Sequence, residues 1–105
     1  MKRWKQILLK PTDSLERTIE VLDKGGLQIA LVADLDNRLL GTVTDGDVRR
    51  ALIRHCGMDT PVSTVMFTSP TVVSELDGRE KMVALMNSRS LLQLPIVDDA
   101  GRIVG

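Results

Sequence analysis

An internal repeat constrains this chain more than any other feature of its sequence. Residues 27–32, Leu-Gln-Ile-Ala-Leu-Val, return 65 positions later as residues 92–97, Leu-Gln-Leu-Pro-Ile-Val. The polar turn and apolar run of residues 34–41 return in residues 99–105 with one residue fewer, so the offset falls to 64 after the turn (from 41 to 105). A period of this length is too long for a solenoid repeat and fits a whole small α/β unit. We expect two such units to pack face to face about a pseudo-twofold axis, because neither buries enough apolar surface alone.

Apolar spacing and turn residues predict the order of elements within each unit. The first helix is expected to begin at Asp13 or Ser14 and to stop at Gly25, and the second to end before Gly57. The elements predicted for the first unit are a strand at 7–9, a helix, a strand at 27–33, a turn at 34–37, a strand at 38–43 and a helix at 45–55. Those predicted for the second unit are a lead-in at 62–67, a helix from Glu75 or Asp77 to Ser88, a strand at 93–97, a turn at 98–101 and a strand stub at 102–104.

The segment Thr44-Asp45-Gly46-Asp47 joins the end of a strand to the start of a helix. The first N–H groups of a helix have no partner within the helix, so such a junction attracts anions, phosphates above all. The simpler interpretation is a capping box, in which Thr44 and Asp47 satisfy each other's backbone. This motif alone is a cap more often than a ligand site, and the repeat is what raises the odds of a site.

These features together resemble the CBS domain, the β-α-β-β-α module first described at the end of cystathionine β-synthase. The resemblance rests on the helix after Pro11-Thr12-Asp13-Ser14-Leu15, the strand and hairpin that follow, and the Thr44-x-x-Asp47 motif that opens the last helix. It covers nearly the whole chain. The resemblance implies an α/β fold of tandem CBS repeats, called a Bateman module, with the first repeat at residues 1–58 and the second at 59–105.

The resemblance also implies a nucleotide site between the repeats. In the family the threonine of the motif contacts ribose or phosphate and the aspartate takes the ribose hydroxyls, which implies these roles for Thr44 and Asp47. Gly46 would allow close approach of a ligand to the backbone. The family places adenine against the start of the strand before the hairpin. The residues that correspond to this position are Gln28, Ile29 and Ala30. The simpler interpretation is that Ile29 belongs to the core and Gln28 to the surface.

Two arginines, Arg49 and Arg50, stand near the start of the second helix, which is unfavourable for cations on dipole grounds. An anion such as a phosphate chain would compensate them, and Arg50 is therefore a candidate nucleotide-binding residue. Exposure to solvent, or pairing with Asp45 and Asp47, explains them equally well.

The second repeat stops at Gly105, before the positions 108 and 111 that would correspond to Thr44 and Asp47. We therefore expect a truncated second repeat, a fragment of a longer protein, and no complete second site. The sequence Thr-Asp-Gly-Asp-Val-Arg-Arg is similar to CBS segments of bacterial sugar-phosphate enzymes. Met1 directly before the module favours a nucleotidyltransferase of the mannose-1-phosphate guanylyltransferase type over an arabinose-5-phosphate isomerase, which carries the pair behind its catalytic domain.

No catalytic set of side chains is predicted in this chain. His55, the only histidine, lies at a helix end, and adjacent Cys56 does not face it. The aspartates near the hairpin and the second helix are better explained as turn formers and caps than as Mg²⁺ ligands, so no metal site is predicted. Met82 and Met86 are expected to pack in the core or at a subunit interface.

Composition excludes several classes of partner. Fourteen acidic and fourteen basic residues cancel, and Trp4 and Phe67 are the only aromatic residues, so neither a basic field nor stacking platforms for nucleic acid are expected. The apolar runs are too short for a membrane span. A single cysteine fits a reducing cytoplasm.

The leading hypothesis is a regulatory module that binds AMP, ADP or ATP between its repeats and modulates a fused catalytic domain. It requires no cofactor, and the resemblance implies a homodimer. The alternative is a structural dimerisation module that binds no nucleotide.

Overall fold

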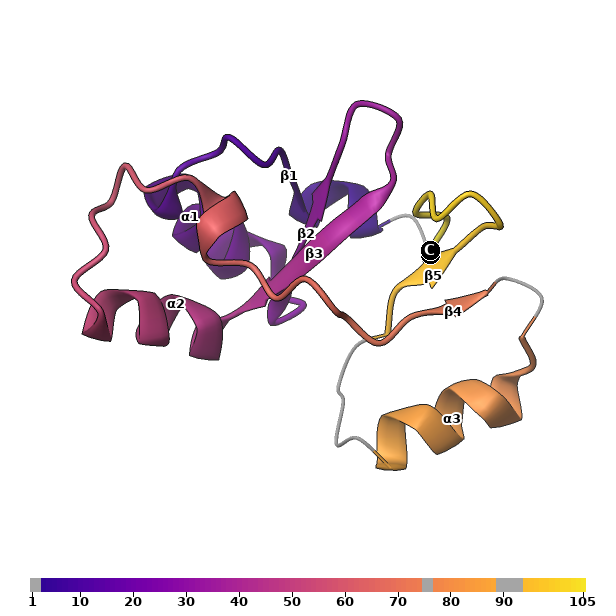
Figure 1. The fold of residues 1–105 in the computed structure, drawn as a ribbon. Helices are drawn as coiled ribbons and strands as arrows, with labels where there is room; N and C mark the ends of the chain where they lie inside the picture. Colours follow the sequence, from indigo (N-terminus) through magenta and orange to yellow (C-terminus); the bar gives the residue numbers. More distant parts are fainter. Residues whose placement is uncertain (1–2, 75–76, 89–93) are drawn as a thin grey trace.

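The computed structural model describes residues 3–74, 77–88 and 94–105 (Figure 1). The first repeat contains a 3-10 helix η1 (Arg3–Ile7), strand β1 (Leu8–Leu9), helix α1 (Leu15–Gly25), strands β2 (Ile29–Ala33) and β3 (Leu39–Thr44), and helix α2 (Asp45–Ile53). The second contains a 3-10 turn η2 (Val62–Thr64), strand β4 (Val73–Ser74), helix α3 (Arg79–Ser88) and strand β5 (Ile96–Val97). The expected α/β order is confirmed, and η1 shortens the first predicted strand at its start.

Helix α1 begins and ends as its sequence predicts. Ser14 is the N-cap, and its Oγ accepts a hydrogen bond of 3.1 Å from the backbone N–H of Arg17. Gly26 closes the helix in the left-handed conformation at φ 69°, which glycine adopts without steric cost. Between these ends, Leu15, Val21 and Leu22 face the core. The choice left open between Asp13 and Ser14 is thereby settled for Ser14.

The first repeat is built on a three-stranded sheet in the order β1-β2-β3. Strand β2 is parallel to β1 and antiparallel to β3, with Ile29 opposite Thr44 and an irregularity in register between Val32 and Ala33. Residues 30–33 of β2 are all buried, as expected for a nearly continuous apolar strand covered on both faces. This register places the start of β2 beside the end of β3, where the Thr44 motif begins.

Helix α2 ends two residues earlier than predicted. The N–H of His55 donates to the carbonyl of Leu52, and that of Cys56 donates to the carbonyl of Ala51, which is the Schellman pattern of a helix C-terminus. His55 occupies the left-handed position at φ 65°, where glycine is the usual residue. The prediction that Gly57 ends the helix was therefore wrong. His55 adopts the left-handed conformation that ends it, two residues before that glycine.

The linker between the repeats also completes the start of α1. The carbonyl of Thr60 accepts from the N–H of Leu15 at 2.8 Å, and the carbonyl of Met58 accepts from the N–H of Glu16 at 3.0 Å. The N–H of Val62 in turn donates to the carbonyl of Asp13 at 2.7 Å. These bonds satisfy donors that the first turn of a helix leaves unpaired.

The two hairpin turns are nearly identical and lie side by side about the expected pseudo-twofold axis. The Oδ1 atom of Asp34 accepts from the N–H groups of residues 36 and 38, and that of Asp98 accepts from residues 100 and 102. Asp98, and not the Asp99 of the sequence alignment, is therefore the counterpart of Asp34. Between the turns, Leu39 donates to the carbonyl of Gly101 and Ile103 donates to the carbonyl of Asn37, a reciprocal pair of bonds.

The core lies mainly in the first repeat. Buried residues of β1, α1, β2, β3 and α2 form one cluster, and the second repeat adds Val62, Val65 and Ile103 to it. None of the residues of α3 is buried, so Met82 and Met86 are half-exposed instead of lying in the core. Figure 1 shows α3 on the side of the molecule away from α1.

Candidate functional site

The start of α2 is held by the side chain of Asp47. Its Oδ2 atom accepts from the backbone N–H of Thr44 at 2.9 Å and from the Oγ1 hydroxyl of Thr44 at 3.1 Å. Thr44 is extended at φ −118° and ψ 172°, as an N-cap residue should be. The capping interaction, which was the simpler interpretation of this motif, is therefore present. It uses one of the two carboxylate oxygens of Asp47.

The other carboxylate oxygen of Asp47 is paired with Arg50. Nη2 of Arg50 lies 2.8 Å from Oδ1 of Asp47, one helical turn away. The Asp47 side chain is 15% exposed and that of Arg50 is 62% exposed, so the pair lies at the edge of a hollow and faces solvent on the arginine side. Pairing with Asp47, one of the explanations left open for Arg50, is thus what the structure contains, while neighbouring Arg49 is exposed.

This pair lines a cavity of about 260 Å³ between the two repeats. Such a volume is slightly below the roughly 300–1,000 Å³ typical of small-molecule sites. The cavity has an apolar part and a polar part. Its lining residues are Ile29, Thr42, Thr44, Asp47 and Arg50 from the first repeat, and Phe67, Pro70, Thr71 and Pro95 from the second.

Backbone pairing fixes the wall that the second repeat supplies. The N–H of Thr42 donates to the carbonyl of Phe67 at 3.0 Å, and the N–H of Phe67 donates back at 2.8 Å. Phe67 is thereby held against β3 beside Thr44, although its side chain is half-exposed at 53%. The cavity therefore depends on the pairing of the two repeats and not on the first repeat alone.

Four of the seven residues predicted for the site line this cavity: Ile29, Thr44, Asp47 and Arg50. The other three do not line it. Ala30 is fully buried within β2, and Gln28 is exposed in the left-handed conformation at φ 66°. Gly46 is covered by the guanidinium of Arg50, since a Cβ placed on Gly46 would stand 3.4 Å from Nη1 of that arginine.

The sequence contained a partial signal for the residues that the prediction omitted. Thr42 lies two positions before Thr44 and therefore points to the same face of the strand. Pro95 occupies, 65 residues later, the position of Ala30, so the repeat already related it to the predicted binding strand. Phe67, Pro70 and Thr71 carried no comparable signal, because only the packing of the repeats brings them beside Asp47.

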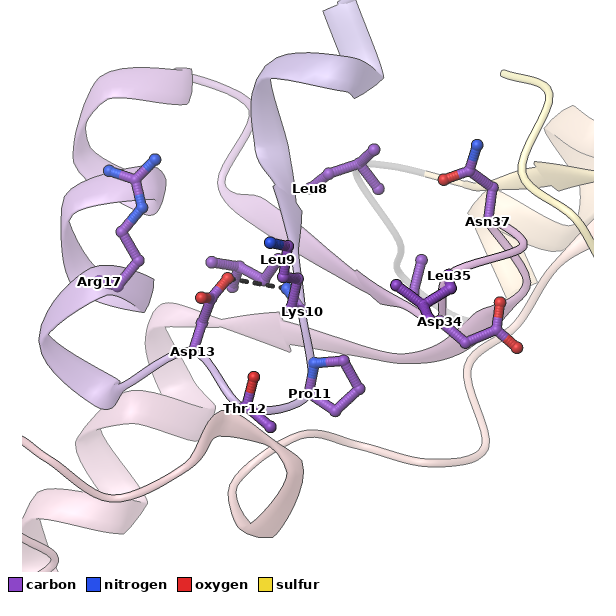
Figure 2. Close-up of a pocket in the computed structure, with 11 residues that line it drawn as sticks. Leu8, Leu9, Lys10, Pro11, Thr12, Asp13, Arg17, Asp34, Leu35 and Asn37 are labelled. Carbon is purple, nitrogen blue, oxygen red and sulfur yellow. Dashed lines mark hydrogen bonds between the residues drawn. The ribbon is translucent and has the colours of Figure 1, made fainter.

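A larger hollow of about 700 Å³ lies at the end of β1, next to the turn after β2 (Figure 2). Its lining contains none of the predicted site residues. The start of α1 borders it, but the N–H groups of Leu15 and Glu16 already donate to the linker and that of Arg17 to Ser14. Figure 2 also shows that the Asp13 carboxylate is engaged by the N–H of Lys10. These contacts leave the smaller cavity as the better candidate.

Two carboxylates outside the cavity have perturbed acidity. The pKa of Asp98 is lowered, first because the backbone N–H of Arg102 donates to it, against an opposing effect of desolvation. The pKa of Asp77 is also lowered, first by the N–H of Ser74 and then by the ammonium of Lys81. Asp98 stabilises a turn, Asp77 accepts from the N–H of Ser74, and neither residue lines the candidate cavity. Among the residues described, no cluster of three or more metal-binding side chains occurs. No helix described here is long and apolar enough to cross a bilayer.

Comparison with curated proteins finds bacterial sugar-phosphate isomerases. The chain is 30% identical to the arabinose 5-phosphate isomerase GutQ of Shigella flexneri over 84 residues, which are 80% of this chain and 26% of the relative. It is 29% identical to GutQ of Salmonella typhi over 100 residues, which are 95% of this chain and 30% of the relative. The chain thus spans less than a third of these proteins. These relatives are isomerases, the second of the two expected parents, and do not support the expected nucleotidyltransferase.

Comparison with solved structures finds CBS-domain proteins. The Pyrobaculum aerophilum protein PAE2072, solved with AMP, matches with a TM-score of 0.81 at 20% identity over 100% of this chain and 85% of that one. CBSX2, also solved with AMP, matches with a TM-score of 0.80 at 27% identity over 93% of this chain and 77% of that one. The CBS domain pair of MJ0100, solved with 5-methylthioadenosine and S-adenosyl-L-methionine, gives a TM-score of 0.80 at 21% identity over 94% of this chain and 77% of that one.

The family model for the CBS domain matches residues 4–54 and again residues 62–105. The two matches cover both repeats and contain every residue that lines the cavity. The chain therefore belongs to the CBS domain family and carries two copies of that domain in tandem.

Proposed function

We propose that this module binds an adenine nucleotide in the cavity between its repeats and thereby regulates a catalytic domain on the same polypeptide. The observation that carries the proposal is the convergence of Ile29, Thr44, Asp47 and Arg50 with residues of the second repeat around one cavity. A carboxylate accepts two hydrogen bonds from a ribose diol, and charged acceptors form the stronger ones. The apolar side chains of Ile29, Phe67 and Pro95 offer contact surface to a base.

The names of the structural neighbours support the ligand class. PAE2072 and CBSX2 were solved with AMP, and the cytosolic domain of the Mg²⁺ channel MgtE was solved with ATP. Gly46, Gln28 and Ala30 stay in the proposal as neighbours of the lining residues. Gly46 would meet a ligand only where the guanidinium of Arg50 moves aside.

The proposed partner domain is a sugar-phosphate isomerase, since the named curated relatives are isomerases of arabinose 5-phosphate. Regulation requires that the nucleotide bind one arrangement of the repeats better than another, because a ligand shifts an equilibrium only by its differential affinity. The cavity wall from the second repeat supports such coupling, since movement of one repeat changes the site.

Calorimetric titration with AMP tests the proposal. Replacing Asp47 by Asn should weaken AMP binding by about 10- to 100-fold, because a charged acceptor of the ribose is lost. Asp45→Asn is the matched control, since Asp45 carries the same charge in the same helical turn but does not line the cavity. Thermal unfolding checks that both variants fold.

The alternative of a structural dimerisation module makes the opposite prediction. In that case the folded chain binds none of AMP, ADP or ATP, and Asp47→Asn changes only thermal stability through the cap of α2. That result would refute the nucleotide-binding proposal.

A further inference from the structure

Opposite charges in the cavity are paired with each other. Asp47 is the only acidic residue that lines it within the described parts of the chain, and Arg50 is the only basic one. Their side chains meet at 2.8 Å. Any ligand that takes a position on Asp47 therefore approaches a carboxylate already engaged by the arginine.

The carboxylate of Asp47 has little remaining capacity. Oδ2 accepts from both the N–H and the hydroxyl of Thr44, and Oδ1 accepts from Arg50. A carboxylate offers about four acceptor positions in total. Two hydroxyl groups of a ribose cannot both reach the open side of Oδ1 while the guanidinium stays there. Bidentate binding of a diol therefore requires that Arg50 withdraw.

Arg50 can leave Asp47 at little cost, and an incoming anion gives its guanidinium a new partner. The side chain is long and 62% exposed, and ion pairs in such positions contribute little to stability. Its guanidinium lies over Gly46 in the first turn of α2, at the positive end of the helix dipole. A guanidinium forms strong paired hydrogen bonds with a phosphate. A neutral nucleoside would displace Arg50 from Asp47 without offering the guanidinium an anion to bind.

We propose, on the basis of the function proposed above, that Arg50 exchanges Asp47 for a ligand phosphate and so makes this site selective for phosphorylated nucleosides. Arg50 pairs with the Asp47 carboxylate when the cavity is empty and binds the ligand phosphate when the cavity is occupied. The ligand class is a nucleoside 5′-phosphate, and neutral nucleosides are discriminated against by the same residue.

Calorimetry with AMP and adenosine on the chain and two variants tests this exchange. The unchanged chain should bind AMP at least about tenfold tighter than adenosine, the effect of one charge-assisted contact. In Arg50→Gln, AMP binding should weaken by about tenfold, while adenosine binds as tightly as before or tighter, because the competitor for Asp47 is gone. Arg49→Gln removes the same charge from the neighbouring exposed position and should preserve the preference for AMP.

Three results would overturn the proposal. Equal affinity of the unchanged chain for AMP and adenosine would show that the site does not select for phosphate. Equal weakening of both ligands in Arg50→Gln would show that the arginine only supports the shape of the cavity. Binding of neither ligand by the folded chain would remove the proposed function itself, and the inference with it.

Discussion

At the scale of single residues, His55 holds a backbone conformation that costs free energy. Its φ of 65° lies in the left-handed region, which is unfavourable for residues with a Cβ by about 1–2 kcal/mol. Glycine avoids this cost but loses more entropy on folding, so His55→Gly should raise the free energy of unfolding by about 0.5–1 kcal/mol. Urea unfolding measures the change. His55→Ala keeps the Cβ and should give no such gain, and a comparable gain there would contradict the explanation.

The cap of α2 illustrates how one residue can serve two roles. Asp47 holds the N–H of Thr44 through Oδ2, pairs with Arg50 through Oδ1, and lines the cavity. The motif is therefore a helix cap, and its place in the cavity lining is compatible with the proposed ligand site. The sequence could identify the pair because both partners lie within one turn, but it could not reveal that Arg50 covers Gly46.

At the scale of elements, we predict that the turn at residues 98–102 makes the stability of the protein sensitive to acid. The folded pKa of Asp98 lies below its ordinary value of 3.8, chiefly because the Arg102 N–H donates to the carboxylate. A lowered folded pKa contributes stability that is present above the unfolded value and is lost as the pH falls through the folded value. The urea concentration at the midpoint of unfolding should therefore decrease as the pH is lowered from about 5 to about 3.

Replacing Asp98 by Asn isolates this contribution. The variant should be less stable than the unchanged chain near pH 6 and should lose less stability on acidification. Asp99→Asn is the control, since Asp99 is exposed and does not accept the N–H groups of the turn. If both variants keep the full acid sensitivity, Asp98 is not its source.

At the scale of the whole molecule, we predict that two copies associate. Helix α3 has none of its residues buried, and Met82, Leu85 and Met86 are only partly covered. Val83 of α3 and Ile53 of α2 are 46% and 68% exposed. Covering such apolar surface is favourable by about 25 cal/mol for each Å² removed from water. Size-exclusion chromatography with light scattering should give the mass of a dimer, and a monomer at high concentration would contradict the prediction.

The repeat made the overall arrangement predictable, since two echoes of one unit imply two similar units packed together. Local signals also limited the cap of α1 to Asp13 or Ser14 and placed the turn at Asp34. The sequence did not reveal the wall formed by Phe67, Pro70 and Pro95, because contacts between distant segments arise only from packing. The end of α2 was placed wrongly because propensity favours glycine over His55 at a left-handed position.

Because the linker caps α1, cleavage of the linker cannot separate the two repeats without disturbing the start of that helix. A protease that cleaves between residues 58 and 59 would loosen the carbonyls of Met58 and Thr60 from the helix they complete. The first repeat would then lose the acceptor of Leu15, because Thr60 leaves with the second repeat, and Met58, the acceptor of Glu16, would become a chain end. Circular permutation at this point would weaken the same hydrogen bonds. The linker therefore stabilises the first repeat as well as connecting it to the second.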